Sequence, residues 1–298
     1  MCTTNTRHAY LIMAHTNFKQ LQILIDLLDD ERNDIYLHID KKAKTFPQLK
    51  SNASHLYFVE QIDIVWGSYN QIQCEMILIE AAAKVGYQYY HLLSGMDLPL
   101  KTQDTIHSFF TVNAGKEFLS IDEDAQSSKK LNLRTEYYHV FGDVAGNGRD
   151  FFSRTLRVTD RILVYLQKAL HIRRESTFPL YKGANWFSIT HNLVCYLLSH
   201  KDAIEKQFSF SSCADEVFLQ SVAMASPFRD NIVNNTLRAI DWTRGRPYVY
   251  RKEDVSTLLA SEALWARKFD QRIDEEAIKI IASQLNQMNQ QEKQQIRN

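Results

Sequence analysis

The sequence contains few of the residues that interrupt regular secondary structure. It has nine glycines and five prolines among 298 residues, less than half of the roughly 12% that the two make up in average proteins. This composition excludes collagen-like, propeller and glycine-rich linker architectures. It predicts long regular elements, in which each glycine marks a position of interest.

Cysteine is scarce, and the sequence has no long apolar run and no excess of charge of one sign. The four cysteines are widely scattered and form no CxxC pair, which excludes a disulfide framework or zinc ribbon and favours a reducing cytosol. No run approaches the ~18 apolar residues of a membrane-spanning helix, and the first residues lack a signal-peptide design. We therefore expect a cytoplasmic protein, peripheral at most to a membrane. The 35 basic and 35 acidic side chains balance, which argues against nucleic acid as a partner.

Apolar periodicity predicts strands that alternate with helices. Residues 9–14 and 35–40 are apolar strands, and a helical spacing over 21–28 separates them. This βαβ unit predicts a parallel sheet. Further strands are predicted at 55–60, 88–93, 116–121, 185–190 and 237–241, and further helices at 68–84, 151–172, 191–208, 215–224, 253–260 and 274–296. With 45% hydrophobic residues and no linker or repeat, we predict one α/β domain over 1–298. It has a sheet-rich nucleotide half over about 1–121, an acceptor and catalytic half over about 122–272, and a helical tail over 273–298.

Polar residues follow the predicted strands, where open parallel sheets bind ligands. They are His15, Asp40, Trp66-Gly67-Ser68, Ser94-Gly95-Met96-Asp97 and Asp122-Glu123-Asp124. The sequence has no GxGxxG, GxxxxGK[ST] or GxSxG string, which argues against Rossmann dehydrogenases, P-loop NTPases and α/β-hydrolases. Polar strand ends without a phosphate loop suit a nucleotide-sugar site.

Seven segments together resemble the core-2/I-branching β-1,6-N-acetylglucosaminyltransferase family, which also contains the peptide O-xylosyltransferases. In family order over about 8–272 they are AYLIMAHTN, YLHIDKKA, VWGSYNQIQCEMILIEAA, YHLLSGMDLPLKT, GANWFSIT, CADEVFLQSV and LWARKFD. The resemblance, to a bacterial-type member, implies a GT-A-like nucleotide-sugar-binding fold with a mostly parallel central sheet flanked by helices. It also implies inverting transfer of a sugar (GlcNAc, xylose or a hexose) from a UDP-sugar, with no metal cofactor.

Inverting transfer needs a carboxylate that deprotonates the acceptor hydroxyl. By resemblance this general base is Glu216, although Cys213 and Ala214 stand where the family pattern has Ser and Pro. Its neighbour Asp215 is either a helix cap or, in a shifted register, the base itself. An acidic pair at a helix start otherwise serves capping and dipole compensation.

The resemblance also implies that basic side chains, instead of a metal, hold the donor diphosphate. The candidates are Lys268 in LWARKFD and Arg246 in RGRPYVY, with Arg244 left open. Residues 229–252 contain six Lys or Arg against two Asp, as such a site requires; a solvated basic face is the alternative. Candidates for the rest of the donor are His15, Asp40, Trp66, Gly67, Ser68 and Asp97.

The acceptor candidates are less specific. By resemblance they are Glu123, Lys130 and Arg134, and sugar stacking adds Trp186 and Trp242. Gly142, Gly146 and Gly148 mark a loop that covers the site in this interpretation. Asp122 and Asp124 form a literal DxD string, so a metal-dependent GT-A enzyme remains an alternative.

We expect a glycan or lipid-linked oligosaccharide acceptor in surface polysaccharide synthesis, reached at the inner membrane face. The alternative from another class is a nucleotide-sugar-binding protein that has lost catalysis.

Overall fold

The structure is a computed structural model that describes residues 5–43, 46–125, 129–141 and 151–297. The predicted loop of Gly142, Gly146 and Gly148 lies outside these residues. Contacts divide the chain into two compact units, which are described separately. The first comprises Met1–Val59, Tyr87–Gly115 and Leu237–Asn298, and the second comprises Glu60–Gly86 and Lys116–Thr236. Each unit draws on both halves predicted from the sequence, and the single domain over 1–298 stays a prediction.

The first unit contains the predicted βαβ arrangement. Strands β1 (Asn5–Ala14), β2 (Asn33–Ile39), β3 (His55–Phe58) and β4 (Tyr87–Ser94) are all parallel, in the order β3-β2-β1-β4. Helix α1 (Phe18–Leu28) connects β1 to β2, and Leu21, Leu24 and Ile25 are fully buried. The α/β class with parallel strands is therefore confirmed.

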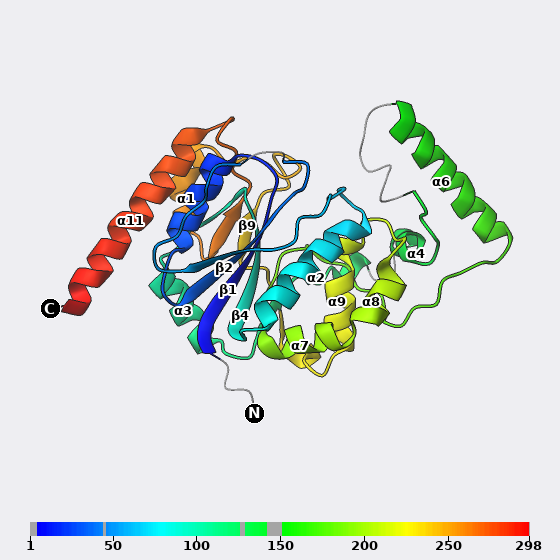
Figure 1. Cartoon of the computed structure of the whole chain (residues 1–298), viewed down its shortest axis with the longest axis horizontal. Coiled ribbons are helices and arrows are strands. Elements are labelled where there is room, and N and C mark those ends of the chain that lie inside the picture. The colour runs from blue at the N-terminus through cyan, green and yellow to red at the C-terminus, as the bar shows by residue number, and fades with distance from the viewer. Residues whose placement is uncertain (1–4, 44–45, 126–128, 142–150, 298) are drawn as a thin grey trace. The chain divides into compact units, whose positions relative to one another are not determined.

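A small sheet in the same unit was only partly predicted. It joins β5 (Asp97–Pro99), β10 (Trp265–Arg267) and β9 (Arg238–Ile240), with β10 antiparallel to β5 and parallel to β9. The helices of this unit are α1, α3 (Gln103–Val112), α10 (Val255–Ala260) and α11 (Glu275–Arg297). Figure 1 shows α11 beside α1. Through the small sheet, residues near 97 and 267 become neighbours.

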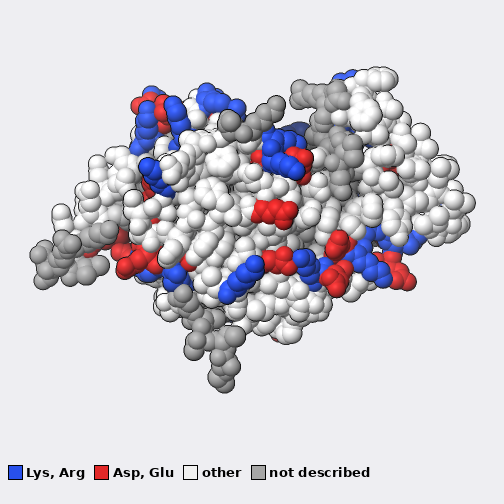
Figure 2. Space-filling model, in the orientation of Figure 1, with Lys and Arg blue, Asp and Glu red and all other residues white. Residues whose placement is uncertain are grey.

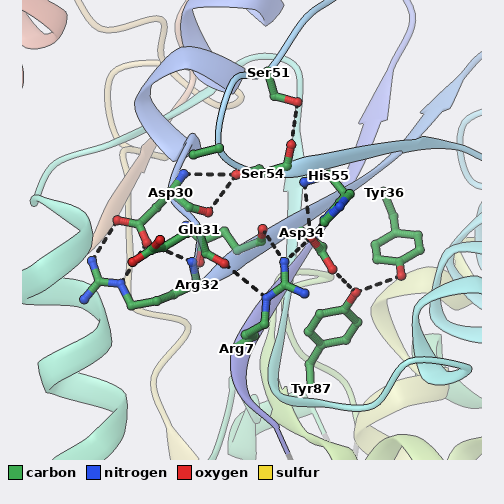
Figure 3. A network of polar contacts seen from close by, with 12 residues as sticks. Arg7, Asp30, Glu31, Arg32, Asp34, Tyr36, Ser51, Ser54, His55 and Tyr87 are labelled. Carbon is green, nitrogen blue, oxygen red and sulfur yellow. Dashed lines mark hydrogen bonds and ion pairs between the residues drawn. The ribbon is translucent and has the colours of Figure 1, made fainter.

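A polar network lies at the amino ends of the parallel strands (Figure 3). The buried carboxylate of Asp34 on β2 accepts hydrogen bonds from Arg7 on β1 and from the Tyr87 hydroxyl on β4. The Tyr36 and Tyr87 hydroxyls are 2.9 Å apart. These contacts fix three strands at one edge, so the carboxyl ends at the opposite edge present the predicted ligand residues.

The second unit packs helices around short strands. Strand β6 (Glu117–Leu119) pairs antiparallel with β7 (Ser188–Thr190) and parallel with β8 (Ile232–Asn234). Burial raises the pKa of Glu117 to about 7, and its carboxyl accepts the Thr190 backbone N–H at 2.8 Å. The helices are α2 (Tyr69–Ala83), α4 (Lys129–Thr135), α6 (Phe151–Ala169), α7 (His191–Ser199), α8 (Lys201–Phe208) and α9 (Phe218–Ala225).

Two predicted helices are corrected. The helix expected over 191–208 is two helices, α7 and α8, because His200 leaves helical geometry and its backbone N–H closes the end of α7 on Leu197. The helix expected over 215–224 begins as a 3₁₀ turn, Ala214–Glu216, and α9 starts only at Phe218. Contacts to other segments hold this turn, as described below.

No helix among the described residues is long and apolar enough to cross a membrane. On the face shown in Figure 2, Lys and Arg lie intermingled with Asp and Glu among the described residues. The zero net charge thus reflects mixed signs on this face rather than two large opposing fields.

Candidate active site

In the second unit, the turn before α2 is joined to the turn that carries the predicted base. Gly67 has a φ of 76°, and its carbonyl accepts the Cys213 backbone N–H at 2.8 Å. A Cβ at Gly67 would lie 3.0 Å from the Cys213 Sγ. Both the left-handed backbone and the close approach favour glycine here. Ser68 caps α2 as predicted, accepting the Asn70 N–H at 3.3 Å.

The two carboxylates of the predicted catalytic pair lie in different environments. Asp215 is buried, and its Oδ2 accepts a hydrogen bond from Gln71 Nε2 on α2 at 2.8 Å. Burial, and then the charge of Glu216, raise the pKa of Asp215 to about 7. Its side chain does not cap α9. Asp215 therefore fixes the turn to α2 and is not a freely accessible carboxylate.

A second buried acid lies behind Asp215. Glu75, one turn after Gln71 on α2, is completely buried, with the side chain of Asn185 beside its carboxyl group. Burial, and then the negative charge of Asp215, raise the pKa of Glu75 well above its usual range. The sequence analysis missed it because α2 showed only an apolar helical pattern there.

Glu216 is partly exposed, with 35% of its side chain accessible, and lies among cations. Arg134 Nη1 on α4 donates to Glu216 Oε2 at 3.1 Å, and Lys182 Nζ is 4.0 Å from the same oxygen. Lys182 also pairs with Asp122 at 3.5 Å. The structure thus brings the predicted acceptor residue Arg134 to the predicted base. Lys182 was missed, although it directly precedes the GANWFSIT string.

Gly183 makes this arrangement sterically possible. Its backbone N–H donates to the Glu216 carbonyl at 2.9 Å, and the neighbouring Asp122 N–H donates to the Lys182 carbonyl at 2.7 Å. A Cβ on Gly183 would lie 1.8 Å from the Ser120 carbonyl oxygen. No side chain fits there, which explains the glycine of the GANW string.

Of the remaining candidates of this unit, Asp122 reaches the Glu216 cluster through Lys182, and no described contact joins Glu123 or Asp124 to it. Glu123 and Asp124 are exposed in a 3₁₀ turn, and Asp122 faces Lys182. No three His, Cys, Asp or Glu side chains gather as metal ligands within the described residues. Trp186 is half-buried, Trp66 is 60% exposed, and the Lys130 side chain lies outside the described residues.

In the first unit, two donor candidates lie at neighbouring strand ends, and a third, Lys268, follows β10 of the small sheet. His15 follows β1 and is exposed, whereas Asp40 follows β2, is buried, and accepts the Lys42 backbone N–H at 2.9 Å. Partial burial, opposed by the charge of Asp40 and reinforced by Lys268, lowers the pKa of His15. Burial, and then the charge of Arg267, lower the pKa of Lys268. The three side chains are thus close enough to interact electrostatically.

The two candidate arginines of the basic loop differ. Arg244 is held in ion pairs with Asp241 at 2.5 Å and Asp254 at 2.7 Å, and its guanidinium lies 4.0 Å from the Tyr248 ring centre. Arg246 is exposed and has no ion pair among the described residues. The loop is joined to Lys268, whose carbonyl accepts the Tyr250 N–H at 2.9 Å. Of the two candidates, Arg246 is therefore the one whose guanidinium is not held by a described ion pair.

The contacts of Asp97 are with neighbouring residues of the fold. Asp97 is fully buried and accepts hydrogen bonds from the Ser94 backbone N–H and hydroxyl, each at 2.9 Å. Arg267 Nε is 3.7 Å away, and burial, opposed by Asp97, lowers the pKa of Arg267. Asp97 therefore organises the turn after β4 and the strand end that leads into Lys268. Trp242 is 61% exposed and stays a stacking candidate.

Parallel strands with polar side chains at their carboxyl ends define an α/β protein of the kind that binds ligands at those ends. Residues 8–262 match the Core-2/I-Branching enzyme family. The chain belongs to this family, which places it among glycosyltransferases of GT-A-like fold.

The curated relatives are distant but cover nearly the whole chain. Xylosyltransferase 2 of Canis lupus familiaris is 20% identical over 92% of this chain and 33% of its own length. The beta-1,3-galactosyl-O-glycosyl-glycoprotein beta-1,6-N-acetylglucosaminyltransferase of Bos taurus is 23% identical over 93% of this chain and 69% of its own. Xylosyltransferase sqv-6 of Caenorhabditis elegans is 21% identical over 84% and 33%. The chain thus spans about a third of the length of the xylosyltransferases it matches.

Proposed function

We propose that this chain is an inverting glycosyltransferase that moves a sugar from a UDP-sugar to a hydroxyl of a glycan. Glu216 is the general base, and Lys268 and Arg246 hold the diphosphate without a metal. Family membership supports sugar transfer, and the names of the relatives include both xylosyl and N-acetylglucosaminyl transfer. The proposed donor is UDP-GlcNAc, UDP-xylose or a UDP-hexose.

The observation that carries the proposal is the contrast between Glu216 and Asp215. A general base must reach the proton it abstracts, and Glu216 is 35% exposed while Asp215 is buried against Gln71. Arg134 donates to the Glu216 carboxylate and sets its orientation. These contacts favour Glu216 over its neighbour as the base.

The proposed reaction is a single displacement. The acceptor hydroxyl loses its proton to Glu216 while its oxygen bonds to the anomeric carbon of the donor. The bond from that carbon to the diphosphate oxygen breaks, so UDP leaves with an additional negative charge. Cations placed beside the leaving phosphate stabilise that charge, which is the role proposed for Lys268 and Arg246.

We propose a cytoplasmic location with peripheral contact at the inner membrane face, and an acceptor that is a lipid-linked oligosaccharide or growing surface polysaccharide. The scattered cysteines and the missing apolar runs support the location. An acceptor that is attached to a lipid would require the protein to work at a membrane surface.

The test is a panel of UDP-sugars with thermal unfolding and UDP release as readouts. A true donor raises the melting temperature with concentration, because ligand binding stabilises the folded state as RT ln(1 + [L]/Kd). UDP release that persists in EDTA supports the proposal. Release abolished by EDTA would instead favour the metal-dependent alternative with Asp122 and Asp124. Binding of a donor without release or transfer to any glycan would favour the inactive nucleotide-sugar-binding protein.

A further inference from the structure

Helix α6 exposes a large apolar surface within the second unit. Only Ser153 of its nineteen residues is buried. Phe151 is 86% exposed, Tyr165 71% and Leu170, just after the helix, 68%. The other large apolar side chains exposed between residues 151 and 172 are Phe152, Val158, Ile162, Leu166 and Ile172. Isolated exposed apolar residues are ordinary, but a contiguous set on one helix marks an interaction surface.

The side of α6 that faces its own unit carries polar residues together with half-buried apolar ones. Ser153, Asp160 and Gln167 recur every seven residues and therefore share one side. Gln167 accepts the Tyr138 N–H at 2.8 Å and donates to the Tyr138 carbonyl at 3.0 Å. Asp160 Oδ2 is 2.7 Å from His139 Nδ1. Although burial opposes it, the hydrogen bond to Asp160 raises the pKa of His139. These contacts attach the helix, together with the Phe141 N–H that donates to Asp160 at 3.3 Å and Lys168 Nζ, which lies 5.5 Å from the Tyr137 ring centre.

The apolar side chains lie on the opposite side. At 100° per residue, Phe151, Ile162 and Leu166 point roughly away from Asp160 and Gln167. The attachment side and the apolar side are therefore different faces. The apolar face is available to a partner without detaching the helix from its unit.

A cationic strip borders the apolar face. Arg154, Arg157, Arg161 and Lys168 follow three-, four- and seven-residue spacing, so they form one row along the helix. Asp160 is the one acidic residue of α6, and its carboxylate pairs with His139. In Figure 2 the surface where α6 lies in Figure 1 is mostly uncharged, as expected for an apolar face with its cations to one side.

We propose that α6 is a membrane-docking helix that lies in the surface of an anionic lipid bilayer. An apolar face inserts at the boundary between headgroups and acyl chains, and a neighbouring row of Arg and Lys binds anionic headgroups. The charge pattern favours an anionic lipid surface over a second copy of this chain, because a second α6 offers another cationic row and no anionic row to pair with it. The inference rests on the proposed function only for the expected contact with a membrane. It adds which surface of the chain makes that contact.

The test is co-sedimentation of the full chain with vesicles of phosphatidylcholine alone or mixed with phosphatidylglycerol. We expect binding to the anionic vesicles, weakened by salt. Ile162→Glu combined with Leu166→Glu abolishes it. Arg154→Gln combined with Arg161→Gln weakens it about 25-fold, since each cation near an anionic surface contributes about fivefold. Val112→Glu, at a residue of α3 that is 84% exposed, is the matched control and binds as wild type.

Circular dichroism and UDP binding in solution confirm that each variant folds. UDP binding also separates the two proposals, because it does not require α6. No sedimentation of the wild type, or unchanged sedimentation of the Ile162/Leu166 variant, would overturn the inference. A dimer seen by light scattering without vesicles, and lost in that variant while vesicle binding is absent, would assign the face to a second copy instead.

Discussion

The guanidinium of Arg134 lies 3.1 Å from the carboxylate of Glu216 and joins α4 to the turn that carries the proposed base. Both side chains are about one third exposed, so a substrate can reach them. Arg134 was proposed from the sequence as an acceptor residue, and the structure adds its hydrogen bond to Glu216.

Arg134→Ala should lower kcat by about 100-fold, because loss of orientation at a reacting group costs about that much. UDP affinity should stay unchanged. Lys182→Ala should have a smaller effect on kcat, since Lys182 Nζ is 4.0 Å from Glu216. Steady-state kinetics with the donor found in the UDP-sugar panel measure both. Equal losses of kcat in the two variants would show that kcat depends on the local positive charge rather than on the Arg134 hydrogen bond.

The two arginines of the basic loop should separate in a binding experiment. Arg246→Ala should weaken UDP binding by about tenfold, as expected for loss of one charge-assisted hydrogen bond. Arg244→Ala should leave the affinity within about twofold, because Arg244 is already paired with Asp241 and Asp254. Isothermal titration with UDP measures both. The opposite ranking would transfer the diphosphate role to Arg244.

Asp215 predicts a pH-dependent stability. Burial, and then the charge of Glu216, raise its pKa to about 7, so the folded chain keeps a proton that the unfolded chain releases near pH ~4. The stabilisation that this bound proton gives to the folded state is full below pH ~4 and falls as the pH rises toward and beyond ~7. Asp215→Asn, which keeps an oxygen for Gln71, should gain about 2 kcal/mol over wild type between pH ~5 and pH ~8. Urea unfolding at both pH values measures this. Parallel pH profiles would show that Asp215 is ionised in the folded protein.

Gly183→Ala should destabilise the second unit. The added Cβ would meet the Ser120 carbonyl at 1.8 Å, and overpacking of this kind costs about 1–3 kcal/mol. Gly115→Ala is the control: it has open space around the new Cβ but also a φ of 83°, so it carries only the smaller cost of left-handed backbone. Thermal unfolding compares them. A larger loss of stability for Gly115→Ala would mean that the segment around Ser120 can move to accommodate the added Cβ.

Much of the first unit followed from local sequence pattern. The spacing of Leu21, Leu24 and Leu28 and the apolar strands on either side predicted a βαβ unit. His15 and Asp40 could therefore be placed at neighbouring strand ends. The contact between β5 and β10 could not, because two three-residue strands far apart in the chain carry no periodicity of their own. Asp97 consequently seemed as suited to a ligand as to the Ser94 turn that it stabilises.

The contacts around Glu216 could be predicted from the sequence only in part. The resemblance identified Glu216 and Arg134, but pairwise contacts such as Gln71 with Asp215 depend on how α2 packs against the turn. Neither Gln71 nor Glu75 interrupts the helical pattern of α2, so nothing local distinguishes them from surface or core residues. The break at His200 was missed for a similar reason, since no glycine or proline marks it.

The most direct test of the account replaces the proposed base. Glu216→Gln keeps the size of the side chain and its ability to accept from Arg134, but it cannot take a proton. Transfer should fall by at least about 100-fold, within the range that general bases contribute, while the Kd for UDP stays within about twofold. Asp215→Asn, at the buried neighbour, should retain most of the activity. Unchanged transfer in Glu216→Gln, with loss of transfer in Asp215→Asn, would contradict the assignment of Glu216 as the base.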